Sequence, residues 1–338
     1  MAEVAVLAGG RSSEREVSLA SGSSVAEGLT DAGHSATLIE IDPEGVWLKD
    51  GSPLLLKPGA GLDGFDVVFP VVHGPWGEDG TLQGLLESLR VPYVGSGVYA
   101  SALCIDKLLA KERMAQAGLP QVDFVAVTES TWRSDRPAIE AETGRLGLPV
   151  WVKPARLGSS VGISRVDHPD GLEDAVVSAL HHDPRVIVEA SSPGREIEVS
   201  VMEVMTPEGD VELVASPAGE ITLPGAKAGE WYDYERKYEA GGMELIVPAD
   251  LDAATAKLVT DTAIAAFTAA GCAGYARVDC FVESGMVLIN EINTAPGFTR
   301  TSVFGRLFAA AGIEYPQLLD LLIQRAIVAH AERQSYVF

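Results

Sequence analysis

The sequence is poor in cysteine and basic residues, and it has no long apolar run. Its 338 residues include 3 cysteines, Cys104, Cys272 and Cys280, whose spacing matches no metal-binding or redox motif. So few cysteines, in an odd number, favour a reducing cytoplasm over a disulfide-bonded secreted protein. No apolar stretch is long enough to span a membrane, and the chain does not open on a basic segment followed by an apolar one. We therefore expect no membrane span and no leader.

Positive charge is also scarce, since 25 Lys and Arg face 48 Asp and Glu and give a net charge of −23. This balance argues against nucleic acid or an anionic membrane as a partner. A phosphate-bearing ligand would need locally placed lysines, arginines or a metal ion, so single basic residues near glycine-rich loops are informative. The length allows two or three domains, and a hydrophobic content of 47% supports substantial cores.

The first hundred residues predict alternating strands and helices. Residues 3–8 form an apolar run that ends at Gly9-Gly10, and a helix follows, for which Ser13 and Glu16 make a capping box. Further strands at 35–41 and 66–72 complete a doubly wound parallel sheet, whose ligand crevice lies at the carboxyl ends of its strands. Glu14 and His73 face this crevice. Glu14 is equally an acid favoured by the helix dipole, and His73 could merely orient its neighbours.

The middle of the chain contains a lysine followed by a serine-rich loop. We expect a helix over 98–118, a polar loop over 129–137, and strands at 121–127, 149–154 and 163–166. Lys153 precedes the loop 158–162, in which the backbone around Ser159 and Ser160 could cradle phosphate oxygens. The loop is not a P-loop, because no Gly-Lys-Ser/Thr follows it. A plain hairpin turn is the other interpretation.

Two later segments carry candidate ligand-binding side chains. Glu189 and Glu196 stand at strand ends where a carboxylate could contact an adenine amino group or a ribose hydroxyl, or simply face water. Residues 215–247 are the most irregular part and hold Lys237 and Tyr238. Aromatic residues in such a loop either recognise a ligand or pack on the loop itself.

The segment 274–297 is the strongest signal, because it predicts a hairpin that carries acids in its strands. A three-residue loop centred on Gly285 would place Asp279 opposite Glu291, with Asn293 on the same face as Glu291. Facing carboxylates repel, and a cation between them removes the objection. Carboxylate and amide oxygens suit Mg²⁺ shared with nucleotide phosphates, although an exposed hairpin with solvated acids is the alternative. Together these features favour phosphoryl transfer from ATP to a substrate anion.

Two segments resemble signatures of the D-alanine–D-alanine ligase family, and the resemblance extends in order from Val4 to about Leu322. They are His73-Gly74-Pro75-Trp76-Gly77-Glu78-Asp79-Gly80-Thr81-Leu82-Gln83-Gly84 and Asn290-Glu291-Ile292-Asn293-Thr294-Ala295-Pro296-Gly297-Phe298-Thr299. The resemblance implies a mixed α/β, ATP-grasp fold. An N-terminal doubly wound domain, 1–97, would precede two α+β domains, 98–190 and 191–338, that hold ATP between them.

The resemblance also implies an enzyme that joins two D-alanines through an acyl phosphate for peptidoglycan precursors, in the cytoplasm and as a homodimer. Its cofactors would be ATP and two Mg²⁺, or Mn²⁺. The motif matches imply a role for each residue. Catalysis would involve Glu14, Ser159, Tyr238, Arg277 and the Gly297 amide. ATP would contact Lys107, Lys153, Ser159, Ser160, Glu189, Glu196 and Lys237. Substrate would contact Glu14, His73, Lys237, Tyr238, Arg277 and Ser302. The metal ligands would be Asp279, Glu291 and Asn293.

Two other functions stay open at this point. One is a ligase of the same family that uses D-lactate or D-serine as its second substrate. The other is a nucleotide-binding module without ligase activity, against which Arg277 argues, because mere binding does not need an oxyanion donor.

Overall fold

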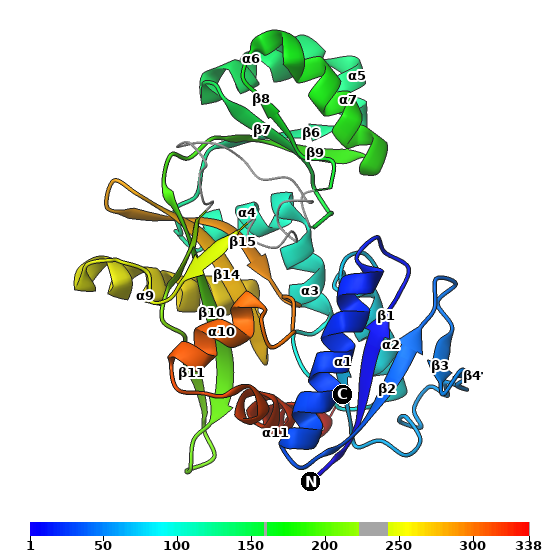
Figure 1. Ribbon diagram of the computed structural model, residues 1–338. Helices are drawn as coiled ribbons and strands as arrows, with labels where there is room; N and C mark the ends of the chain where they lie inside the picture. The colour runs from blue at the N-terminus through cyan, green and yellow to red at the C-terminus, as the bar shows by residue number, and fades with distance from the viewer. Residues whose placement is uncertain (159–160, 223–242, 338) are drawn as a thin grey trace.

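The computed structural model describes residues 1–158, 161–222 and 243–337, and three β-sheets organise them (Figure 1). Four predicted site residues lie outside the described part: Ser159, Ser160, Lys237 and Tyr238. Among the residues described, no helix has the length and apolar character needed to cross a bilayer.

The N-terminal sheet has five strands in the order β4-β3-β2-β1-β5. They are β1 (Glu3–Gly9), β2 (Ser35–Ile41), β3 (Trp47–Lys49), β4 (Ser52–Pro53) and β5 (Val67–Pro70). The core strands β2, β1 and β5 are parallel, as expected from their apolar runs, and β3 and β4 add an antiparallel edge. Its helices are α1 (Arg15–Asp31) and α2 (Thr81–Leu89). The predicted capping box is wrong: Glu14 occupies the N-cap of α1 and no side chain caps it.

The second sheet is a four-stranded antiparallel unit in the order β6-β9-β7-β8, drawn at the top of Figure 1. Its strands are β6 (Phe124–Thr128), β7 (Val150–Pro154), β8 (Ser164–Val166) and β9 (Arg185–Ala190). The helices α5 (Glu129–Ser134), α6 (Arg136–Leu146) and α7 (Leu172–His182) accompany it, with a 3₁₀ turn at Pro169–Gly171. The polar loop expected over 129–137 is helical instead, because Thr128 and Thr131 form a capping box that starts α5.

The third sheet is antiparallel and holds the predicted hairpin. Its strands are β10 (Arg195–Met205), β11 (Val211–Ala215), β12 (Gly219–Thr222), β13 (Glu244–Ile246), β14 (Tyr275–Glu283) and β15 (Met286–Asn293). Helices α3 (Val98–Ile105), α4 (Lys107–Gln116) and α9 (Ala253–Ala270) share a hydrophobic core with it. The single helix expected over 98–118 is therefore two helices. Asp106 separates them, since its carboxylate accepts the backbone N–H groups of Leu108 and Leu109 and starts α4.

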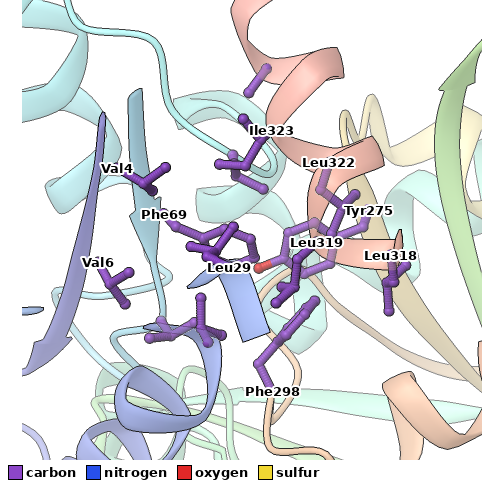
Figure 2. Close-up of a cluster of buried hydrophobic side chains, with 14 of the residues drawn as sticks. Val4, Val6, Leu29, Phe69, Tyr275, Phe298, Leu318, Leu319, Leu322 and Ile323 are labelled. Atoms are coloured by element: carbon purple, nitrogen blue, oxygen red, sulfur yellow. The ribbon is translucent and has the colours of Figure 1, made fainter. Parts of the chain in front are cut away.

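One hydrophobic core joins the N-terminal sheet to the end of the chain (Figure 2). Val4, Phe69 and Leu29 of the first unit pack with Leu319 of α11 (Tyr315–Gln334) and with Tyr275 at the start of β14. The short helix α10 (Val303–Ala310) adds aromatic contacts. This packing fixes β14 against the N-terminal unit, two residues before Arg277. The domain boundaries predicted near residues 97 and 190 stay a prediction, and α3 and α4 pack on the third sheet.

Candidate active site

The β14–β15 hairpin places Asp279 directly opposite Glu291, as the sequence predicts. It achieves this register differently from the expectation. The turn has two residues, Ser284 and Gly285, which both have the positive φ angles, 51° and 78°, that tight hairpin turns require. A bulge beside Asp279 then adds one residue, Asn290, to β15. The predicted three-residue loop is therefore wrong, whereas the predicted pairing is confirmed.

Side chains of this hairpin form a compact charged cluster on one face of the third sheet. Arg277 donates two hydrogen bonds of 2.7 Å to the two carboxylate oxygens of Asp279. Asn293 donates its amide N–H to Asp279 at 3.0 Å and to Glu291 at 3.5 Å. Glu198, opposite Asp279 on β10, lies 3.2 Å from the Arg277 guanidinium. Burial disfavours the charge of Arg277, but Asp279 and Glu198 outweigh it and raise the pKa of Arg277 well above its ordinary value.

The predicted magnesium ligands fit such an ion by chemical type and position. Two carboxylates and one amide converge at adjacent places on β14 and β15, and all three offer oxygen, the donor that a hard divalent ion prefers. Within the described ranges, no group of three or more His, Cys, Asp and Glu side chains is arranged to hold a metal, so Asn293 is needed as the third ligand. Asn293 presents its NH₂ group to the carboxylates here and must turn its amide to bind a cation.

Two lysines from different elements, the half-buried Lys107 and the buried Lys153, are electrostatically linked to this cluster. Lys107, at the start of α4, donates a hydrogen bond of 2.6 Å to the carbonyl oxygen of Leu157, the residue immediately before the serine-rich loop. Lys153 on β7 lies 2.5 Å from Glu189. Burial lowers the pKa of Lys107. For Lys153 burial is again the largest single effect, but Glu189, Glu291 and Glu196 together outweigh it and raise the pKa. Glu291 acts on the pKa of both lysines, so the metal-ligand hairpin and the lysines share one electrostatic environment.

Glu14, the acid predicted to contact the first substrate, is buried between two loops. A side chain at Gly74 would begin 2.5 Å from its carboxylate, and one at Gly158 would begin 3.5 Å away. Glu14 thus lies where the first signature loop meets the approach to the serine-rich loop. Its negative charge also raises the pKa of His73, although burial has the larger effect and lowers it. A neutral imidazole is favoured as a result.

His73 is held by contacts that sequence analysis did not find. Its Nε2 lies 3.1 Å from Ser21 Oγ of α1, and its Nδ1 lies 3.0 Å from the carbonyl oxygen of Ala295. Ser21 also accepts the backbone N–H of Phe298 at 3.3 Å. One serine therefore connects both signature segments. Because Ser21 sits among small residues in the middle of a helix, nothing in the sequence marks it.

The loop after β15 brings Gly297 and Ser302 together. A Cβ atom at Gly297 would begin 3.2 Å from Ser302 Oγ. That hydroxyl accepts the backbone N–H of Thr299 at 3.0 Å, and it sits at the N-cap of α10. The structure thus places the predicted oxyanion donor and the predicted carboxylate contact side by side. Glu196, on β10, lies near enough to Lys153 to raise its pKa.

Glu78 is a further candidate site residue, to which the sequence pattern alone assigns no role. Its carboxylate accepts the backbone N–H of Gly74 at 2.6 Å within the signature loop. Burial and the neighbouring Glu14 charge raise the pKa of Glu78 to about 8. A carboxyl group with such a pKa among functional side chains can hold or release a proton near neutral pH.

Comparison with known proteins identifies relatives over nearly the whole chain. The family model described as "D-ala D-ala ligase C-terminus" matches residues 113–324, and "D-ala D-ala ligase N-terminus" matches residues 3–59 and 53–96. The chain is 45% identical to the D-alanine–D-alanine ligase of Mycolicibacterium vanbaalenii, covering 96% of each protein. It is 41% identical to that of Deinococcus radiodurans, covering 96% of this chain and 98% of the relative.

Solved structures agree with these sequence relatives. The VanG D-Ala:D-Ser ligase from Enterococcus faecalis superposes with a TM-score of 0.84 at 33% identity, covering 96% of this chain and 99% of the other. The D-alanine–D-alanine ligase from Coxiella burnetii superposes with a TM-score of 0.81 at 32% identity, and the match covers 98% of this chain and 95% of the other. The expected ATP-grasp fold class is confirmed by these neighbours.

Proposed function

This chain belongs to the D-alanine–D-alanine ligase family, and from that premise we propose how its site joins two D-alanines with the use of ATP. The observation that supports the proposal most directly is the cluster of Arg277, Asp279, Glu291 and Asn293. It combines an oxyanion donor with a divalent-cation ligand set on one hairpin, in which Arg277 and Asp279 are buried. A module that only bound nucleotide would need the ligand set but not the arginine beside it.

The first step transfers the γ-phosphoryl group to the carboxylate of one D-alanine. Glu14 is buried where it can pair with the substrate ammonium and orient the carboxylate toward the phosphate. Lys107 and Lys153 contact the phosphates and offset their negative charge. Mg²⁺ or Mn²⁺ ions bound by the hairpin would add further neutralisation of the phosphate charge.

The second step forms the peptide bond. The neutral amine of the second D-alanine attacks the acyl phosphate carbon, and the phosphate leaves. Arg277 and the Gly297 amide stabilise the oxyanion of the tetrahedral intermediate, while Ser302 contacts the second carboxylate. The leaving phosphate can take the proton that the amine loses. His73, kept neutral by burial, contacts Ser21 with one ring nitrogen and the Ala295 carbonyl with the other, so its role here is to hold the first signature segment against the loop that carries Gly297.

Several roles remain predictions from the family resemblance alone. Ser159, Ser160, Lys237 and Tyr238 would complete the phosphate and second-substrate contacts. Glu189 and Glu196 would contact adenine and ribose. A homodimer and a cytoplasmic location are likewise expectations.

The test is to incubate the purified protein with ATP, Mg²⁺ and D-alanine, alone or with D-serine or D-lactate, and to measure ADP and products. We expect D-alanine alone to give ADP, phosphate and the dipeptide in equal amounts. Formation of ADP only when D-lactate or D-serine is added would instead indicate a ligase specific for that second substrate.

A variant of Arg277 separates catalysis from binding. Arg277→Lys keeps the positive charge but loses the two-pronged hydrogen bonding, so we expect kcat to fall about 100-fold and ATP affinity to change less than about threefold. Arg306→Lys, whose guanidinium bonds only the Leu245 carbonyl among the described residues, is the matched control. Equal kcat values for Arg277→Lys and the unaltered protein would contradict the role given to Arg277.

A further inference from the structure

Lys111 is a buried cation beside Lys153 and Glu189, in the region proposed to bind the nucleotide. It follows Lys107 by four residues on α4, so both side chains leave the same face of the helix. Its side chain is 3% exposed, and its ammonium lies 2.8 Å from one carboxylate oxygen of Glu189. Lys153 lies 2.5 Å from the other oxygen. Glu189 itself is 4% exposed, so one buried carboxylate separates two buried ammonium groups.

The contact of Lys111 with Glu189 is a close ion pair, and within the described part of the chain the ammonium has no other hydrogen-bond partner. Its further neighbour is the ring of Phe124, whose centroid lies 5.7 Å away. Burial alone would raise the pKa of Glu189, but Lys153 and Lys111 together lower it to about 2. Glu189 is therefore ionised, and two cations share its charge.

This arrangement has a consequence for Lys153. A lysine that contacts nucleotide phosphates must weaken its pairing with any other anion. If Lys153 were the only partner of Glu189, turning toward phosphate would leave a buried carboxylate unpaired, which is strongly unfavourable. With Lys111 on the other oxygen, Glu189 keeps a counter-ion whichever way Lys153 turns.

We propose that Lys111 is a positioning residue that serves as the permanent counter-ion of Glu189 and thereby releases Lys153 to bind the phosphates of ATP. The inference rests on the proposed function, because it takes Lys153 as a phosphate contact. It assigns Lys111 a larger effect on phosphate affinity than on adenosine affinity, because in its absence Lys153 still holds Glu189 in place. A lysine that merely stabilised the packing of α4 against β9 would affect both equally or neither.

The test compares the affinities of ATP, ADP and adenosine for the unaltered protein and for Lys111→Met, measured by calorimetric titration. We expect ATP and ADP to bind on the order of tenfold more weakly to the variant, because Glu189 then retains Lys153, while adenosine affinity changes less than about threefold. Lys257→Met, which removes a lysine 74% exposed and paired with Asp261, is the matched control and should change none of the three.

A double variant distinguishes a counter-ion role of Lys111 from a role in packing. In Glu189→Gln the neutral amide needs no counter-ion, so adding Lys111→Met to it should weaken ADP binding by less than about threefold. A packing role predicts the same loss in both backgrounds, and that result would overturn the proposal. If Lys111→Met does not fold, Lys111→Gln removes the charge, keeps a polar group and carries the same expectations.

Measurements on the unaltered protein distinguish a failure of the proposed ligase function from a failure of the role proposed for Lys111. If it binds ATP no better than adenosine, the proposed function fails and this inference fails with it. If it binds ATP tightly and forms dipeptide, but Lys111→Met retains full phosphate affinity, only the role of Lys111 is wrong.

Discussion

The unusual proton affinity of Glu78 gives a prediction that can be tested without substrate. Its pKa is raised from 4.5 to about 8 by burial and by Glu14, with a smaller contribution from Glu291. The Gly74 backbone N–H and the Lys107 ammonium act in the opposite direction but do not prevail. The folded protein therefore keeps a proton on Glu78 over a pH range in which the unfolded chain has lost it.

The sign and size of the effect on stability follow from this difference. Between pH 4.5 and 8 the folded state binds one proton more than the unfolded state, so the free energy of unfolding falls as pH rises, by up to about 1.4 kcal/mol per pH unit. The whole window corresponds to an upper limit of about 5 kcal/mol. Because Glu78 is partly accessible to water, solvation of the carboxylate makes the loss smaller than this limit. We expect the free energy of unfolding to fall by about 2 kcal/mol across the window.

Glu78→Gln removes the titration and keeps an oxygen that can accept the Gly74 N–H. We expect the variant to match the unaltered protein in melting temperature at pH 5 and to exceed it by about 3 °C at pH 8.5. Scanning calorimetry, in buffer that contains a chelator and no nucleotide, measures the melting temperature at each pH. Glu142→Gln, at an exposed site on α6, is the matched control and should shift neither value. Parallel pH profiles for Glu78→Gln and the unaltered protein would refute the reasoning.

Two further predictions test contacts around the site. Gly74→Ala should raise the KM for D-alanine roughly tenfold without changing ATP affinity, because its Cβ would begin 2.5 Å from the Glu14 carboxylate. Gly118→Ala, with a similar positive φ but open space, is the kinetic control. Tyr315→Phe should lower the free energy of unfolding by about 1 kcal/mol, since the buried hydroxyl donates to the Phe298 carbonyl at 2.5 Å; an unchanged melting temperature would contradict this.

The hairpin shows how far local sequence patterns determine a site. The pairing of Asp279 with Glu291 was predictable, because alternation and a glycine turn restrict the register to a few choices. The bulge at Asn290 was not, since it depends on the packing of the sheet as a whole. Ile289 and Ile292 both point into the core beneath the sheet although three positions separate them, and only an extra residue in β15 permits this.

Helix boundaries illustrate the opposite case. The sequence contains suitable N-cap residues, but tertiary contacts decide which of them caps a helix. Ser13 is a favourable capping residue, yet α1 begins without a side-chain cap, and the neighbouring Ser12 donates to the carbonyl of His73 instead. Asp106 is an equally ordinary N-cap residue. Its second oxygen pairs with Arg185 on β9, so the break between α3 and α4 also fastens the helix to the second sheet.

The pairing of Asp279 with Glu291 predicts a cation between the two acids, and the protein supplies this positive charge itself. Arg277 donates to both oxygens of Asp279, and Asn293 donates to each acid. The facing acids alone are therefore not evidence for a metal. The ligand set still fits, because Glu198 already lies 3.2 Å from Arg277 and can take over its charge when Asp279 turns to a cation. Glu198 for Arg277 and Lys111 for Glu189 are then two instances of one arrangement, in which a buried reactive group keeps a second counter-ion so that its first partner is free to bind ligand.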